Sequence, residues 1–469
     1  MKKEERFMNM SQAAPTGAAI GAVNARIDRL PTWCPGASAK WIFVIAYFFA
    51  FYDIIAIGAV LPNVTKAFHL APAEVALPLT TSLFGYIVGA LLFGRMADRY
   101  GRRPMLAATL ALLAVSSVLC GMSWGLSSLA TFRFLNGMGI GAQITLTATL
   151  INEFSPAHQR ARNIQLNIIA AGCGDAAAPF VAMALLSFGP IGWRLVLGFG
   201  VLAFIPLLSL ARLPESPRWL AANGRVKEAE AIVAQMEERL SAQGHGLPAI
   251  APSVNASEAE EMAHVGMRDL LRRPWIGRVM VVTLYWVLLY VTTYGFLGFE
   301  TVLLDKLAVH KPHGLLYTAL GDLAFPIGAA LPLLLINRIP RRFLLALSSL
   351  VYALGLAVLA MNNGSTAVVA GAFIVALVIL VNSGVGYTYT SEIFPTRLRA
   401  SAMGLADGVG HLGGIVAPYL VLASLSMWGA RGAFAFLAGL MVVCAVLIAG
   451  LGVRGAAEAR LDEGVGEPA

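Results

Sequence analysis

Twelve apolar stretches, each roughly 20 residues long, follow one another along this chain, and they constrain its fold more than any other feature. A helix rises about 1.5 Å per residue, so roughly 20 residues cross the ~30 Å hydrocarbon core of a bilayer. Only helices and closed barrels satisfy the backbone in lipid, and because these stretches do not alternate between polar and apolar residues they predict helices. The predicted spans are 41–61, 77–94, 105–123, 128–151, 163–187, 193–211, 275–300, 314–337, 343–361, 365–391, 401–425 and 430–453.

The composition is that of a membrane protein. The chain is 58% hydrophobic and 13% charged, with a mean hydropathy of +0.73, which is too apolar for a soluble globular protein. One long polar segment, 212–274, follows the sixth span, and charged residues at helical spacing predict a surface helix over 225–240. The segment leaves no room for a soluble catalytic domain, so we expect no enzyme.

The net charge of +8 is explained by membrane topology and does not indicate nucleic-acid binding. If both termini are cytoplasmic, most of the 34 Lys and Arg fall on the cytoplasmic side, as the positive-inside rule requires. Anionic membrane lipids are then the expected partners of these side chains. Residues 1–38 hold no apolar core, so we expect no cleaved signal peptide. The four cysteines show no paired spacing, so we expect neither a disulfide framework nor a metal site.

The spans and charges divide the chain into five predicted parts. They are a cytoplasmic segment 1–40, a six-helix bundle 41–211, a cytoplasmic linker 212–274, a second six-helix bundle 275–453 and a cytoplasmic tail 454–469.

The two predicted bundles carry one motif in register. Asp98-Arg99-Tyr100-Gly101-Arg102-Arg103 recurs as Asn337-Arg338-Ile339-Pro340-Arg341-Arg342. When the two halves are aligned with the same offset, Glu153 aligns with Glu392, Pro156 with Pro395, Arg160 with Arg399 and Pro179 with Pro418. A long apolar chain of two similar halves is typical of a membrane transporter whose site lies between the repeats.

Four motifs identify the family that the chain resembles. They are residues 94–104, Gly-Arg-Met-Ala-Asp-Arg-Tyr-Gly-Arg-Arg-Pro; residues 133–141, Arg-Phe-Leu-Asn-Gly-Met-Gly-Ile-Gly; residues 214–218, Pro-Glu-Ser-Pro-Arg; and residues 392–399, Glu-Ile-Phe-Pro-Thr-Arg-Leu-Arg. With them, residues 30–455 resemble a major facilitator superfamily transporter. The resemblance implies an all-α membrane fold of twelve helices in two pseudo-symmetric six-helix bundles, which work by alternating access. It also implies a functional monomer in the inner (cytoplasmic) membrane of a bacterium.

Within that superfamily, the chain is most similar to bacterial proton symporters for aromatic acids and related metabolites, which share the 214–218 motif with sugar porters. Aromatic acid symporters carry two aspartates in the first span, whereas residues 48–53, Phe-Phe-Ala-Phe-Tyr-Asp, retain only the second. Sugar porters carry paired glutamines early in the seventh span, where residues 285–290 read Tyr-Trp-Val-Leu-Leu-Tyr. The fifth-span signature of drug antiporters is not visible at residues 171–175, so uptake is favoured over export.

Charged residues at the inner ends of the spans predict a cytoplasmic gate. In the superfamily, such residues form ion pairs between the halves that latch the cytoplasmic side, a two-state switch that a ligand can bias. The alternative is that the arginines only anchor helices to the inner leaflet. Gly94 is expected to allow close helix approach, Gly101 a tight turn, and Asn337 an asymmetric latch. The gate candidates in the first half are Gly94, Asp98, Arg99, Gly101, Arg102, Arg103, Glu153, Arg160, Glu215 and Arg218, and in the second half Arg338, Arg342, Glu392 and Arg399.

Asp53 and Arg133 are the candidates for proton coupling. An ionisable residue at the bilayer centre costs at least ~2.5 kcal/mol, so each one is a functional candidate. The two lie at similar depths in the first and fourth spans and can meet inside the first half. A carboxylate near an arginine stays ionised until a proton arrives or something competes for the arginine, as coupling requires. Arg133 is also expected to bind an anionic group of the solute; the alternative is a permanent structural pair.

Other polar and aromatic side chains inside the spans are candidates for solute binding. Asp407 shares a helix face with His411, and the two form either a proton relay or a locally satisfied pair. Tyrosines in the seventh and tenth spans would suit a small organic acid or heteroaromatic metabolite, but packing tyrosines would give the same pattern. Glu300 is expected to be solvated at the outer end of its span. The candidates, besides Asp53 and Arg133, are Gln143, Asp175, Tyr290, Tyr294, Asp322, Asn382 and His411.

The sequence therefore predicts a proton-coupled secondary transporter that imports a small organic solute, an organic or aromatic acid, by alternating access. The alternatives are a proton-driven efflux antiporter for drugs or metabolites, and a non-transporting membrane sensor or membrane enzyme. No phosphate-cradling nucleotide loop is present, so we expect the proton gradient as the energy source and no cofactor.

Overall fold

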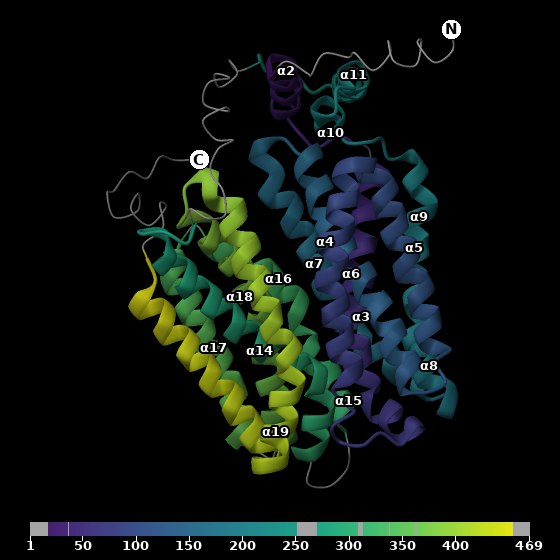
Figure 1. Ribbon diagram of the computed structural model, residues 1–469, viewed down its shortest axis with the longest axis vertical. Helices are drawn as coiled ribbons and strands as arrows, with labels where there is room; N and C mark the ends of the chain where they lie inside the picture. The colour runs from purple at the N-terminus through teal and green to yellow at the C-terminus, as the bar shows by residue number, and fades with distance from the viewer. Residues whose placement is uncertain are drawn as a thin grey trace.

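The computed structural model describes residues 17–35, 37–250, 270–307, 313–336, 338–361 and 364–453. Within these residues the chain forms helices and no strands. Two helical bundles stand side by side, and three further helices, α2, α10 and α11, lie at one end of the first bundle (Figure 1). The expected all-α fold of two bundles is confirmed.

The first bundle holds the first six predicted spans. Five are continuous helices: α3 (Ala37–Phe68), α4 (Leu77–Tyr100), α5 (Arg102–Gly121), α6 (Leu126–Phe154) and α7 (Arg160–Leu186), the last preceded by η1 (Ala157–Gln159). The sixth alternates between 3-10 and α turns: η2 (Gly189–Ile191), α8 (Gly192–Gly198), η3 (Phe199–Ala203), α9 (Phe204–Ser209) and η4 (Leu210–Arg212). Gly198, Gly200 and Pro206 explain the interruption, because glycine and proline are the poorest α-helix formers.

The second bundle consists of α14 (Trp275–Leu307), α15 (Gly314–Asp322), α16 (Ala324–Leu335), α17 (Arg341–Met361), α18 (Ser365–Glu392) and α19 (Thr396–Leu451). In the described part of the chain, eleven helical stretches are long and apolar enough to cross a membrane. The last of them covers 51 residues, and inside it Gly429 has a φ of 69° that breaks the helical path. It therefore holds the two predicted spans 401–425 and 430–453, and twelve spans result. Several helices run past the apolar stretches, as α3 does beyond 41–61, because polar residues continue them.

The helices outside the bundles are held together by apolar contacts and ion pairs. The predicted surface helix 225–240 is confirmed as α11 (Val226–Ala242), and it packs with α10 (Pro217–Ala222) and α2 (Gly17–Asp28). Glu237 of α11 pairs with Arg26 of α2 at 2.6 Å and with Arg29, the residue after α2, at 2.8 Å. Burial alone would raise the pKa of Glu237, but the hydrogen bonds from the two arginines outweigh it and hold that pKa below its usual range.

Glycines bring neighbouring helices of the first bundle into backbone contact. A Cβ added at Gly85 or Gly89 of α4 would overlap the backbone of α6, and one at Gly137 or Gly141 of α6 would overlap the backbone of α4. Small residues at helix interfaces allow this approach, and van der Waals contact drives helix association in lipid. The Gly-rich motif at residues 133–141 is therefore a packing device for α4 and α6.

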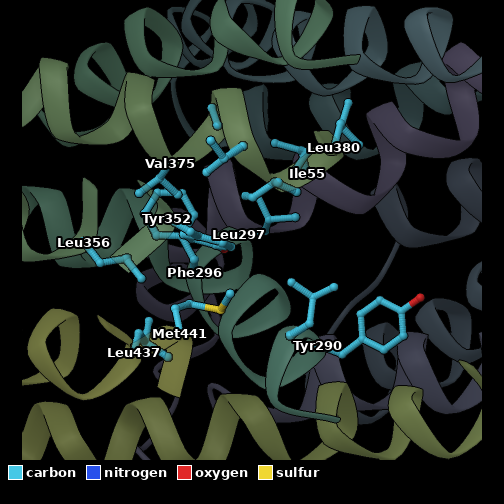
Figure 2. Packing of buried hydrophobic residues seen from close by; sticks show 14 of the residues in the cluster. Ile55, Tyr290, Phe296, Leu297, Tyr352, Leu356, Val375, Leu380, Leu437 and Met441 are labelled. Carbon is cyan, nitrogen blue, oxygen red and sulfur yellow. The ribbon is translucent and has the colours of Figure 1, made fainter. Parts of the chain in front are cut away.

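The two bundles share a continuous apolar cluster. Figure 2 shows part of it, including Ile55 of α3 and Leu297 of α14. A Cβ at Gly58 of α3 would overlap the carbonyl oxygen of Leu297, and one at Gly172 of α7 would lie 2.9 Å from the carbonyl group of Phe325 on α16. The halves therefore meet directly along α3–α14 and α7–α16.

We expect Gly137→Ala to destabilise the folded protein by about 1–3 kcal/mol, because the added methyl group must displace the backbone of α4 at Ser82. Gly439→Ala is the matched control: nothing lies within 4 Å of a Cβ there, so higher helix propensity should leave stability unchanged or slightly increased. Thermal unfolding in detergent measures both. Equal melting temperatures for the two variants would contradict this account of the packing.

Candidate functional site

Asp53 lies inside the first bundle and not at the interface between the bundles. It is 1% exposed, and its Oδ2 accepts hydrogen bonds from Ser117 Oγ of α5 at 2.7 Å and from Asn136 Nδ2 of α6 at 3.1 Å. Gly200 of η3 packs against it, since a Cβ there would lie 2.6 Å from Oδ2. The first, third, fourth and sixth spans therefore enclose this carboxyl group.

Arg133 of α6 is buried beside Asp53. It is 2% exposed and donates to the backbone oxygen of Asp53 at 3.3 Å, to Asn136 Oδ1 at 3.0 Å and to Ser82 Oγ at 3.1 Å. Its Nε has no hydrogen-bond partner. The guanidinium thus keeps one buried donor free, which is costly unless a bound group can use it.

Asn136 joins the two candidates for proton coupling. Asp53 and Arg133 meet inside the first half as expected, but the acid and the guanidinium form no direct ion pair. Instead the Asn136 carboxamide accepts from Arg133 and donates to Asp53. Asn136, Ser117 and Ser82 were missed by the sequence reasoning. The sequence held a signal for Asn136, which stands three residues after Arg133 and so shares its helix face. It held none for Ser117 and Ser82.

Arg133 also faces a small cavity between the bundles. The cavity has a volume of about 30 Å³, and Ser82, Tyr86 and Arg133 line it from the first half while Tyr294 and Gly298 line it from the second. Such a volume holds about two water molecules. An organic solute therefore needs the halves to move apart before it can reach Arg133.

An aromatic group lies next to this cavity. We define it as Tyr86, Trp286, Tyr290, Tyr294, Tyr387 and His411, which come from α4, α14, α18 and α19. Tyr86 stacks on His411 across the interface with ring centres 4.8 Å apart, and Tyr290 lies 4.2 Å from His411. The candidates Tyr290, Tyr294 and His411 are thus brought together, with Tyr86 and Trp286 as members that sequence reasoning missed.

Asp407 is held by this aromatic group and not only by its helical neighbour. Its Oδ1 accepts from Tyr290 Oη at 2.6 Å and from Tyr387 Oη at 2.8 Å, while His411 Nδ1 lies 3.7 Å from Oδ2. The reading of Asp407 and His411 as a purely local pair is therefore wrong. Tyr387 is 39% exposed, so this carboxylate lies close to an accessible surface.

Two amide candidates differ in their surroundings. Asn382 accepts from Ser349 Oγ at 3.0 Å and from Tyr285 Oη, inside the second bundle, and these contacts fix the bundle itself. Gln143 of α6 donates to Thr147 Oγ1 at 3.2 Å, and its Oε1 has no partner although the residue is fully buried. Gln143 therefore offers a free acceptor, and Asn382 does not.

Three acids lie buried around the contact between α7, α14 and α15. Asp175 is 3% exposed, Asp322 is fully buried, and Glu300 is 2% exposed. The expectation that Glu300 is solvated was wrong, because α14 continues to Leu307 and places Glu300 about 10 Å below its end.

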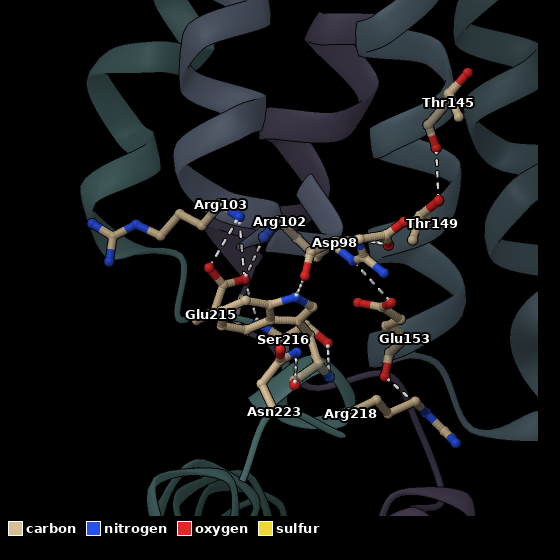
Figure 3. Close-up of polar contacts among 11 residues, drawn as sticks. Asp98, Arg102, Arg103, Thr145, Thr149, Glu153, Glu215, Ser216, Arg218 and Asn223 are labelled. Carbon is tan, nitrogen blue, oxygen red and sulfur yellow. Dashed lines mark hydrogen bonds and ion pairs between the residues drawn. The ribbon is translucent and has the colours of Figure 1, made fainter. Parts of the chain in front are cut away.

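Figure 3 shows the polar contacts around six of the ten gate candidates of the first half, which are Asp98, Arg102, Arg103, Glu153, Glu215 and Arg218. Arg102 pairs with Asp98 at 2.6 Å and with Glu153 at 3.2 Å. Glu215 accepts from the backbone N–H groups of Arg102 and Arg103 at the start of α5, where an acid also favours the helix dipole. Gly101 has a φ of 108°, so the expected tight turn is present.

The helices beside the first bundle complete this network. Arg218 donates to the backbone oxygen of Glu153 at 3.1 Å and to Asp28 of α2 at 2.8 Å, and Arg160 donates to Asp28 at 3.0 Å. Burial lowers the pKa of Arg218. Asp28 was missed by the sequence reasoning, because nothing in its local pattern marks it.

In the second half, Glu392 pairs with Arg341 at 3.2 Å, and Arg341 was not among the candidates. Arg342 donates to the backbone oxygen of Gly452 at 2.9 Å and Arg399 to that of Ser391 at 2.6 Å, while Arg338 is exposed. In the part of the chain that the structure describes, the ion pairs of the gate residues each lie within one half. The latch between halves therefore stays a prediction for another conformation.

Gly94 and Arg99 lie outside this network of hydrogen bonds and ion pairs. A Cβ at Gly94 would meet nothing within 4 Å, so the expected close helix approach at Gly94 is absent in this conformation. Arg99 contacts the ring of Tyr100. The expected asymmetry at Asn337 lies outside the described residues.

Comparisons with known proteins agree with these features. The profile of the family described as "Sugar (and other) transporter" matches residues 40–453. The metabolite transport relative YyaJ of Bacillus subtilis is 29% identical over 90% of this chain and 93% of its own. The niacin transporter NiaP of Acinetobacter baylyi is 28% identical over 85% of this chain and 89% of its own. The inward-open structure of the xylose transporter XylE from E. coli superimposes with a TM-score of 0.73 at 20% identity, covering 89% and 96% of the two chains, which shows the major facilitator fold.

We expect Asn136→Ala to cost about 1–3 kcal/mol of stability, because it leaves Arg133 and Asp53 each without one buried partner. Thr131→Ala is the control on the same helix: Thr131 is exposed and bonds only within α6. Thermal unfolding at neutral pH compares the two. A melting temperature for Asn136→Ala equal to that of the control would show that the bridge contributes nothing.

Proposed function

Because the chain belongs to the sugar (and other) transporter family, we propose that it is a proton-coupled symporter that imports a small aromatic or heteroaromatic carboxylate. The observation that carries the proposal is Arg133: a buried guanidinium with a free donor faces the cavity between the halves beside an aromatic group. Guanidinium groups bind carboxylates, and aromatic rings bind flat rings. The name of the relative NiaP, a niacin transporter, supports the same class of solute.

Asn136 supports a route from proton to solute. With Asp53 ionised, Asn136 donates to it and accepts from Arg133, so the guanidinium stays occupied. A proton on Asp53 turns an acceptor into a donor, and the carboxamide must turn to accept from it. Arg133 then loses its bond to Asn136 and turns toward a carboxylate in the cavity. Proton binding and anion binding thereby favour each other, and the halves carry both across together.

The direction of transport follows from the proton gradient. Protons enter Asp53 from the acidic outer side, the loaded protein faces inward, and release of the proton restores the bond between Asn136 and Arg133. The name of another relative, the arabinose-proton symporter of Bacillus subtilis, 25% identical over 76% of this chain, supports coupling to protons. This mechanism would place the protein in the inner membrane of a bacterium, with both termini in the cytoplasm.

A sugar is the second candidate solute. The buried amide oxygens of Gln143 and Asn167 have no hydrogen-bond partner, and sugar hydroxyl groups could donate to both. The family description and the arabinose-proton symporter support this class. A thermal-shift screen of purified protein with nicotinate, benzoate, arabinose and xylose separates the two classes. Stabilisation by sugars alone would contradict the carboxylate proposal.

We expect Asp53→Asn to abolish proton-driven accumulation of a solute found in that screen while leaving exchange of the solute across the membrane. The amide cannot take up the coupling proton, but it can fill the same space. Right-side-out vesicles with an inward proton gradient measure accumulation, and Glu74→Gln, a change of an exposed acid, is the control. Full accumulation by Asp53→Asn would remove Asp53 from coupling, and gradient-driven expulsion by the unmodified protein would establish an efflux antiporter.

We expect Arg133→Ala to weaken carboxylate binding by about 10- to 100-fold, the range for losing a hydrogen bond to a charged group. Arg133→Lys keeps the charge but loses the fork geometry, so its loss should be smaller. Calorimetric titration of the purified variants measures both. Equal affinities for the unmodified protein and Arg133→Ala would show that the anion binds elsewhere.

A further inference from the structure

Asp322 is a buried acid without any hydrogen-bond partner. Both of its carboxyl oxygens lack one, although the residue is fully buried at the end of α15. Glu300 of α14 lies close enough to interact electrostatically with Asp322, and its Oε1 also lacks a partner. Neither side chain belongs to the network of Asp53 and Arg133. Polar groups buried in this way are costly, and a protein keeps them only where something else compensates.

Asp175 faces Asp322 from the other half. Gly172 of α7 packs against Phe325, and one helical turn toward the outer side brings Asp175 and Asp322 to the same level. The two acids lie close enough to interact electrostatically. By the rise of α15, Asp322 lies about 12 Å below the outer end of its span. Three carboxyl groups thus surround a contact between the halves.

The groups around Asp322 supply no compensating positive charge. Asp175 of α7 and Glu300 of α14 lie near it. Tyr352 of α17 lies near Glu300, and Tyr294 lies near Asp175. On α15 itself, Thr318 bonds to Thr301 of α14. Among the described residues, no Lys, Arg or His pairs with any of the three acids, and no group of ligands suited to a metal ion is present. Three buried carboxyl groups without a counter-charge are costly to ionise together, because burial penalises each charge and like charges repel.

We propose that Asp322, with Glu300 and Asp175, is a second proton-binding site, separate from Asp53, and that it controls closure of the outer side of the protein. In the present conformation the halves are packed at this level, and the acids are held without charge. When the outer side opens, water reaches the three acids and they ionise. Repulsion between Asp175 and Asp322 then opposes reclosure until protons from outside neutralise them. The outer side therefore closes readily only when protons are abundant there, which makes the cycle follow the external pH.

The test measures how the outer side opens with pH. A cysteine replacing Leu297, which packs against Gly58 at the interface, reports opening through its reaction with a membrane-impermeant thiol reagent; Cys173, the exposed natural cysteine, is first changed to serine. We expect the labelling rate to rise with pH, because one linked proton changes the open-to-closed ratio by up to about tenfold per pH unit. In Asp322→Asn, which is uncharged at every pH, labelling should stay low and independent of pH.

Glu74→Gln is the control, because it neutralises an exposed acid outside this site. It should keep the pH dependence of labelling, and a pH dependence in Asp322→Asn equal to that in Glu74→Gln would overturn the proposal. No solute is needed, so the outcome is independent of the proposed function. Glu300→Gln and Asp175→Asn each remove one like-charged neighbour and should each reduce the pH slope; if Asp322→Asn does not fold, an unchanged slope in both rejects the site.

Two further measurements separate a proton from other occupants. Infrared spectra detect protonated carboxyl groups in apolar surroundings, and such a signal should be smaller in Asp322→Asn than in Thr318→Val. Labelling is repeated at constant pH with sodium or choline as the cation. Suppression of labelling by sodium in the unmodified protein, but not in Asp322→Asn, would show a metal-cation site and contradict the assignment of a proton.

Discussion

The Arg133 guanidinium is buried in a medium where every charge must find partners within the protein, and the first bundle is arranged around that requirement. A charge far from water is tolerated only with hydrogen bonds in good geometry. Most donors of the guanidinium have acceptors, and these acceptors come from three different spans: Ser82, Asn136 and the backbone of Asp53. Its Nε remains without a partner, and Arg133 lines the cavity that the first half shares with the second. Structure and function therefore share one cause: the group that most needs partners is also the one best placed to receive an anion.

Close helix packing makes this network possible. The glycines between α4 and α6 bring the two backbones into contact, which places Ser82 within reach of Arg133. Gly200 gives Asp53 the space that a side chain would fill. The same kind of contact occurs between the halves at Gly58 and Gly172. Because contacts through glycine consist of backbone atoms with little side-chain adaptation, the halves are suited to move as rigid bodies between a few packed arrangements.

Much of the fold could be predicted from the sequence, and the site could be predicted in part. Apolar length and the positive-inside rule locate spans without tertiary information, because lipid acts on each span separately. The meeting of Asp53 and Arg133 followed from depth along two spans. The role of Asn136 did not, because a neutral amide in an apolar helix can equally be a packing residue. The burial of Glu300 was missed because the end of an apolar stretch does not mark the end of a helix, and α14 continues to Leu307.

The sequence by itself determined that this chain crosses the membrane twelve times as two related halves, since periodicity, apolar length and repetition are properties of the chain alone. Only the tertiary structure decided which polar groups became partners. It replaced a direct ion pair by a bridge through Asn136, drew Asp407 to tyrosines of α14 and α18, and paired Glu392 with Arg341. It also brought Asp175 and Asp322 together across the interface. The physical reason is that hydrogen bonds and charge contacts depend on helix rotation to within a few ångströms, whereas the cost of burying a span in lipid depends only on its composition.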